Sequence, residues 1–104
     1  MKTLITSTTS TPEGPFDKRF GRAAWFCVLD EKTGETTFIK NENAEGQSGI
    51  GTKTAEKVVE LGVGKVISGD FGPKAKKLLD KFGVQMVIIN EDLKVIDVIN
   101  RIKG

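Results

Sequence analysis

The chain has 104 residues, of which 38% are hydrophobic, and its 16 basic and 14 acidic side chains leave a formal net charge of +2 at pH 7. This length suits one domain with a single core, and the nearly balanced charge excludes a nucleic-acid binder that relies on strong positive charge. The single cysteine, Cys27, excludes an internal disulfide, and the lack of histidine removes the commonest acid–base group and metal ligand. We therefore expect one domain over residues 1–104 in a reducing compartment.

Neither a secretion signal nor a membrane span is expected. Leu4 and Ile5 are the only large apolar residues in the first stretch after Met1, whereas a signal peptide needs a core of about 7 to 15 apolar residues. No later run approaches the roughly 20 apolar residues of a membrane-spanning helix. We expect a cytoplasmic monomer or weak dimer that binds neither membranes nor nucleic acid.

The first part of the chain predicts three strands. Residues 1–6 indicate a short strand, and the polar segment 7–15 that follows indicates a loop. The uninterrupted apolar run 25–29 is typical of a central strand that is buried on both faces. The turn at 30–34 leads into the Thr-rich and Ile-containing segment 35–40, so these two strands should form a hairpin.

The next part alternates helices and strands. Apolar residues at helical spacing predict one helix that ends at Gly62 and another that begins at Pro73 and closes at Gly83. Short apolar runs predict strands at 65–68 and 84–89.

A last helix is expected at the C-terminal end. Asn90 can cap it, with Glu91 and Asp92 in its first turn and Arg101 and Lys103 in its last turn. This charge order complements the helix dipole. Because the segment is rich in β-branched residues, packing should support this helix more than intrinsic propensity does.

The predicted order β-β-β-α-β-α-β-α gives a three-layer α/β/α fold of the ribonuclease-H-like kind. A strand meander followed by two right-handed crossovers places five strands in the order 3-2-1-4-5, with strand 2 antiparallel. The connections that leave strands 1, 3 and 4 then emerge at one edge of the sheet, where ligands bind in open α/β folds.

Three glycine-containing loops should meet at that edge. They are 16–23, 46–51 and 68–74, and the second and third each lead into a predicted helix. Glycines also make ordinary turns, and this alternative stays open for each loop. The candidate ligand-binding residues are Asp17, Arg19, Gly21, Arg22, Ser48, Gly49, Gly51, Gly69, Gly72 and Lys74.

Charged residues in two of these loops favour an anionic ligand. Arg19 and Arg22 can clamp an anion with several oxygen or sulfur atoms, or they can form structural salt bridges with Asp17 or Asp70. Lys74 lies at a helix start, where unpaired N–H groups attract anions, but the lysines of that helix also suit a solvated face. The loop 46–51 lacks the ending of a P-loop, which argues against a nucleotide.

Enzyme functions fit this sequence poorly. A ribonuclease-H-type nuclease needs carboxylates on its first strand, and residues 1–6 contain none. Serine and cysteine nucleophiles would lack a histidine base, and there is no C-x-x-C pair. Cys27 lies within an apolar strand, so a core position is favoured over the alternative of a metal ligand.

The three loops together resemble the dinitrogenase iron–molybdenum cofactor biosynthesis family, which includes NifX, NafY and the C-terminal domain of NifB. The motifs are D-K-R-F-G-R-A at 17–23, G-Q-S-G-I-G-T-K-T-A at 46–55 and S-G-D-F-G-P-K-A at 68–75, and the resemblance extends over residues 1–98. It implies a ribonuclease-H-like domain that binds, stores or passes on iron–sulfur or molybdenum-containing clusters without catalysis. The implied partners are metallocofactor-assembly proteins.

The chain departs from this family at one position. Nitrogenase-linked members often carry histidine in a D-x-H-F-G stretch, where this chain has Arg19. Direct imidazole ligation is therefore excluded, and Arg19, Arg22 and the loop amides are expected to hold an anionic cluster. Two alternatives are an interaction or regulatory module that no longer binds a cluster, and a binder of a phosphate-bearing small molecule at the helix after Gly72.

Overall fold

The computed structural model describes residues 1–103, which form a five-stranded sheet and three helices. None of the helices in this range is long and apolar enough to cross a membrane. In chain order the elements are β1 (Lys2–Ser7), β2 (Trp25–Asp30), β3 (Thr36–Lys40), α1 (Ile50–Glu60), β4 (Lys65–Ser68), α2 (Pro73–Lys81), β5 (Gln85–Ile88) and α3 (Val95–Lys103).

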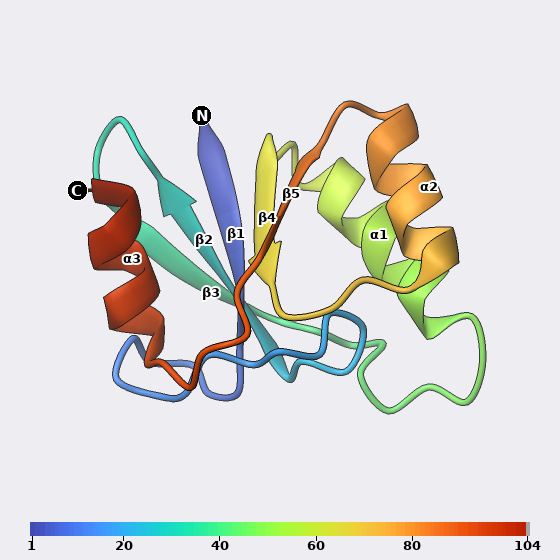
Figure 1. Ribbon diagram of the computed structural model, residues 1–104, viewed down its shortest axis with the longest axis horizontal. Coiled ribbons are helices and arrows are strands. Elements are labelled where there is room, and N and C mark those ends of the chain that lie inside the picture. Colours follow the sequence, from blue (N-terminus) through green and yellow to red (C-terminus); the bar gives the residue numbers. More distant parts are fainter. Residues whose placement is uncertain (104) are drawn as a thin grey trace.

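The strand order is β3-β2-β1-β4-β5, with β2 antiparallel to both of its neighbours and β4 parallel to β1 and β5. The predicted α/β fold and strand order are therefore confirmed. Helices α1 and α2 cover one face of the sheet, and α3 covers the other (Figure 1). The strands β1, β3, β4 and β5 all end at the same edge, which is the lower edge in Figure 1.

Each face of the sheet has its own hydrophobic core, because neighbouring residues of a strand point to opposite faces. On β1, Leu4 packs toward α1 and α2, whereas Ile5 packs toward α3, and both are fully buried. The core on the α1–α2 side also holds Phe20 and Phe71, whose ring centroids are 5.1 Å apart. These two aromatic side chains anchor two of the glycine loops to the same core.

Both predicted helix ends at glycine are confirmed. Gly62 and Gly83 follow α1 and α2 with φ angles of 71°, a conformation that glycine adopts without strain. The predicted start of α2 at Pro73 is also confirmed.

The predicted cap of the last helix is wrong. α3 begins at Val95 rather than after Asn90, because the residues before it pair with the loop that follows β1. The Phe16 N–H donates to the Leu93 carbonyl at 2.8 Å, and Pro15 and Lys94 form a bridge. Long-range pairing thus replaces the first helical turn that the local sequence favours.

Glu91 and Asp92 consequently form ion pairs outside α3 instead of lying in its first turn. Glu91 binds Arg101 at 2.9 Å, and Asp92 binds Lys18 at 2.6 Å. Hydrogen bonding to the basic partner, aided by its charge, lowers the pKa of each carboxyl. Arg101 and Lys103 lie in the last turn of α3, as predicted.

Candidate anion-binding site

A cavity of about 340 Å³ lies at the loop edge of the sheet, where three segments that are distant in sequence meet. One segment follows β1, one begins α1, and one connects β4 to α2 (Figure 1). The predicted meeting of these segments is therefore confirmed. The lining residues are Arg19, Phe20, Gly21, Arg22, Ile50, Gly51, Asp70 and Gly72.

The loop at residues 16–23, called the arginine loop below, is hydrogen-bonded to the ends of β1 and β4. The Gly69 N–H donates to the Lys18 carbonyl at 3.1 Å, and the Asp17 N–H donates to the Thr6 carbonyl at 3.0 Å. The Thr6 hydroxyl bonds the Asp17 carbonyl and the Ser68 hydroxyl. A Cβ at Gly69 would lie 2.7 Å from the Lys18 Cα, so glycine is required for this close approach.

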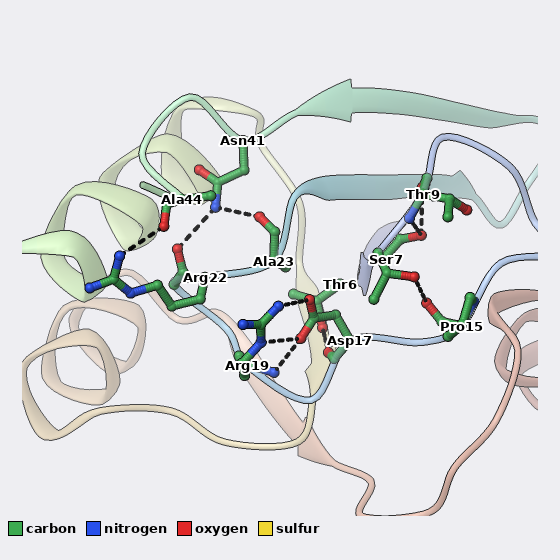
Figure 2. A network of polar contacts seen from close by, with 12 residues as sticks. Thr6, Ser7, Thr9, Pro15, Asp17, Arg19, Arg22, Ala23, Asn41 and Ala44 are labelled. Carbon is green, nitrogen blue, oxygen red and sulfur yellow. Dashed lines mark hydrogen bonds and ion pairs between the residues drawn. The ribbon is translucent and has the colours of Figure 1, made fainter. Parts of the chain in front are cut away.

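Arg19 is held in place by a buried carboxylate. Asp17, whose side chain is 3% exposed, accepts hydrogen bonds from the Arg19 backbone N–H at 2.9 Å, from Nε at 3.0 Å and from Nη2 at 2.9 Å (Figure 2). The hydrogen bonds and the charge of Asp17 raise the pKa of Arg19. The structural salt bridge with Asp17 is thus present. It leaves Nη1 of the 67% exposed Arg19 side chain without a partner among residues 1–103.

Arg22 extends in another direction and ties the loop before α1 to the arginine loop. Its Nη1 donates to the carbonyl of Ala44 at 3.0 Å (Figure 2). The same Nη1 donates to the carbonyl of Gly46, also at 3.0 Å. Within the described chain, Nε and Nη2 of Arg22 have no hydrogen-bond partner. Each arginine therefore uses part of its guanidinium for structure and retains N–H groups beside the cavity.

Asn41 is a structural residue of this region that the sequence analysis missed. Its Nδ2 donates to the carbonyls of Gly21 at 3.1 Å and Ala23 at 2.8 Å (Figure 2). Its Oδ1 accepts the Asn43 N–H at 3.1 Å. The signal available in the sequence was an asparagine directly after a strand, a position where its side chain commonly bonds the backbone two residues on.

Two helices begin at the cavity with unpaired backbone N–H groups. Ile50 and Gly51 open α1, and Gly72 precedes α2. Neither helix has a side-chain cap or an acidic residue in its first turn. In the described part of the chain, the N–H groups of Ile50, Gly51 and Thr52 in α1, and of Lys74 and Ala75 in α2, have no acceptor. Both helix ends therefore favour a negatively charged ligand.

The local structure requires glycine at the start of α1 but not at the start of α2. Gly49 has a φ angle of 65°, which L side chains rarely adopt, so the turn into α1 depends on it. A Cβ at Gly72, in contrast, would have no atom within 4 Å. The absence of a side chain at Gly72 keeps the space before α2 open.

The ten predicted ligand-binding residues separate into four groups. The cavity is lined by Arg19, Gly21, Arg22, Gly51 and Gly72. The arginine loop is held in place by hydrogen bonds of Asp17 and Gly69. Ser48 and Gly49 are exposed beside the cavity, and Lys74 lies in a neighbouring surface groove. Phe20, Ile50 and Asp70 line the cavity but were not among the predicted residues.

Cys27 does not line the cavity. Its side chain is fully buried in the core on the α3 side, and burial raises the pKa of its thiol to about 11. Among residues 1–103, no three histidine, cysteine or acidic side chains are grouped so that they could hold a metal ion.

The residues at the cavity come from the same three loops that carry the family motifs. The family model described as dinitrogenase iron-molybdenum cofactor matches residues 1–104. The chain belongs to this family. Membership associates it with the handling of that cofactor.

Solved structures of two other proteins have the same fold. The apo form of the orange protein from Desulfovibrio gigas is 29% identical, with a TM-score of 0.90 over 97% of this chain and 85% of that one. A NifB-like protein from Thermotoga is 25% identical, with a TM-score of 0.83 and the same coverage of 97% and 85%.

One curated relative, an uncharacterized protein of Methanocaldococcus jannaschii, is 30% identical over 74 residues. The match includes 68% of this chain and 63% of that protein, so it spans less than two thirds of the relative's length.

Proposed function

We propose that this protein is a non-catalytic carrier for an anionic metallocluster of the iron–sulfur or molybdenum-containing type, and that it acts in metallocofactor assembly or trafficking. The observation that carries this proposal is the meeting of two uncapped helix starts and two arginines around one cavity. Membership of the iron–molybdenum cofactor family and the likeness to the orange protein support it.

The cavity offers hydrogen-bond donors rather than a large positive charge. Asp17 offsets the charge of Arg19. Among the lining residues, the negative charge of Asp70 balances the positive charge of Arg22. Unpaired N–H groups of both helices and of both guanidinium groups remain available. Such a set suits an anion whose charge is spread over several oxygen or sulfur atoms, because each atom can accept a separate hydrogen bond.

This arrangement also suits transfer of the cargo. A cluster that is held by hydrogen bonds to an open rim can leave without breaking a metal–protein bond, whereas thiolate ligation would require ligand exchange. Because Cys27 is fully buried and its thiol has a raised pKa, it is not a ready thiolate ligand. We place the cargo against Arg19, Arg22, Gly51 and Gly72, with Asp17 as the residue that orients Arg19.

Anaerobic reconstitution tests this function. The purified chain is incubated with iron, sulfide and molybdate and desalted, and the retained metals are measured together with the visible absorption spectrum. We expect a coloured protein with a constant ratio of metal to chain. The double substitution of Arg19→Ala and Arg22→Ala should lower the retained metal about tenfold or more, because charge-assisted hydrogen bonds are lost at both arginines.

The third arginine of the chain provides a matched control. Arg101 lies on α3 and pairs with Glu91, outside the cavity lining. Arg101→Ala should therefore retain as much metal as the unaltered chain. Equal metal retention by the double variant, with its fold intact by circular dichroism, would refute the proposed site. A chain that retains no metal at all would refute the proposed cargo.

A further inference from the structure

The exposed face of α2 carries a row of lysines whose positions oppose helix stability. The helix sequence is PKAKKLLDK, with Lys74, Lys76 and Lys77 in its N-terminal half and no acidic residue in its first turn. Positive side chains near a helix N-terminus are unfavourable to the dipole. Lys74 and Lys77 are three residues apart, and Lys77 and Lys81 are four apart, so like charges are neighbours on one face.

No ion pair within residues 1–103 offsets the charge of these lysines. The lysines of α2 take part in no ion pair, whereas Lys18 and Lys65 have acidic partners. Both α2 and α3 have basic residues in the last turn, but only α3 has an acidic residue, Asp97, in the first turn. Positive charge near the start of α2 is unfavourable, and no ion pair in the described chain compensates for it. Such a departure from helix preferences is expected where the side chains bind another molecule.

The lysine row borders a groove with an apolar floor. Thr52 of α1 and Lys74, Lys77, Leu78 and Lys81 of α2 line a surface hollow of about 330 Å³. The stems of long lysine side chains add apolar surface while their ammonium groups stay in water. Phe82 is 55% exposed directly after α2, and the Lys81 ammonium lies 5.8 Å from the centre of its ring.

We infer that this lysine groove docks an acidic protein partner, which presents an apolar side chain to the groove and carboxylates to the lysines. The row from Lys74 to Lys81 extends about 10 Å along the helix at 1.5 Å per residue, a length that two turns of a partner helix match. A protein suits the apolar floor better than a nucleic acid does, because a phosphate backbone offers no apolar group to fill it.

The groove lies beside the candidate cavity. Lys74 is two residues after Gly72, which lines the cavity, and both belong to the start of α2. A partner on the lysine groove would therefore be seated next to the proposed cargo. The use of this surface in cargo transfer rests on the proposed function, whereas the binding of an acidic partner does not.

Peptide titration of the full chain, labelled with ¹⁵N, tests this inference. The probe is a helical peptide of about two to three turns, with a central leucine flanked by glutamates, and the matched peptide has glutamine at each glutamate. We expect amide shifts at Thr52 and along 74–82 with the acidic peptide only. The double substitution of Lys77→Glu and Lys81→Glu should weaken binding about tenfold at low salt. Neither residue lines the cavity, so metal retention should not change.

The control is Lys32→Glu, an exposed lysine in the turn between β2 and β3 at the opposite edge of the sheet. It makes half of the same charge change and should leave peptide binding unchanged. The inference is overturned if Lys32→Glu weakens binding as much as Lys77→Glu alone, or if the shifts lie elsewhere. It is also overturned if the glutamine peptide binds equally, or if single-stranded DNA of the same charge binds more tightly.

Discussion

The start of α3 and the starts of α1 and α2 lie at the same edge of the sheet, but they differ in how their backbone is satisfied (Figure 1). At α3, the N–H groups of Val95 and Ile96 donate to the carbonyls of Gly14 and Pro12 at 3.0 and 2.8 Å. The Asp97 side chain accepts the Lys94 N–H at 3.0 Å. At α1 and α2, the corresponding donors have no partner in the described chain.

This difference separates a structural helix end from a candidate binding end. The loop after β1 closes the start of α3 with its first half, and with its second half it brings Arg19 and Arg22 to the open starts. One loop therefore stabilises the start of α3 and brings two arginines to the starts of α1 and α2, where we propose that a ligand binds. Helix starts that stay open beside two arginines are where an external anion gains most.

The largest expected effect is a loss of stability when the contact between Gly69 and the arginine loop is disrupted. In Gly69→Ala, the new Cβ would meet backbone atoms of Lys18, 2.7 Å from its Cα and 2.8 Å from its carbonyl oxygen. Because the backbone at this point cannot yield as a flexible side chain would, the free energy of unfolding should fall by about 3 kcal/mol. Urea denaturation measures the loss, and Gly72→Ala should leave stability nearly unchanged, because its Cβ meets open space. Similar losses in both variants would contradict this reading of the two glycines.

A smaller effect is expected when a carboxylate is introduced at the start of α2, where the backbone N–H groups are unpaired. In Gly72→Asp, the carboxylate can accept the unpaired N–H groups of α2, which should raise the free energy of unfolding by a few tenths of a kcal/mol. The same carboxylate would occupy the place of an external anion, so binding of tetrathiomolybdate should weaken about tenfold. Visible absorption during titration measures the affinity. Unchanged affinity would show that the start of α2 does not contact the cargo.

The smallest of the three main effects concerns the start of α3, at about 1 kcal/mol against about 1.4 kcal/mol for a tenfold loss of affinity. Asp97→Ala removes the side-chain acceptor of the Lys94 N–H and a negative charge at the start of α3, and should lower the free energy of unfolding by about 1 kcal/mol. Thr52 occupies the same third position in α1, but its side chain makes no hydrogen bond among residues 1–103. Thr52→Ala should therefore cost much less in the same thermal or urea unfolding measurement. An equal cost would remove the distinction between the two kinds of helix start.

The local sequence was sufficient for most of the fold. The apolar run at β2, the glycines after α1 and α2 and the Pro73 start each produce their effect through neighbouring residues, and all lie where they were predicted. The strand order also followed from the sequence, because short connections and right-handed crossovers leave few arrangements open. The meeting of the three loops was a consequence of that order.

Only the tertiary structure decided which loop residues support the site and which line it. Asp17 and Gly69 stand in the same motifs as Arg19 and Gly72, yet the first two form contacts between β1, β4 and their loops. The predicted helix start at Asn90 is wrong for the same reason, because pairing of Pro15 with Lys94 outweighs a local capping preference. Contacts between residues far apart in the chain determined these outcomes, and no pattern of neighbouring residues records them.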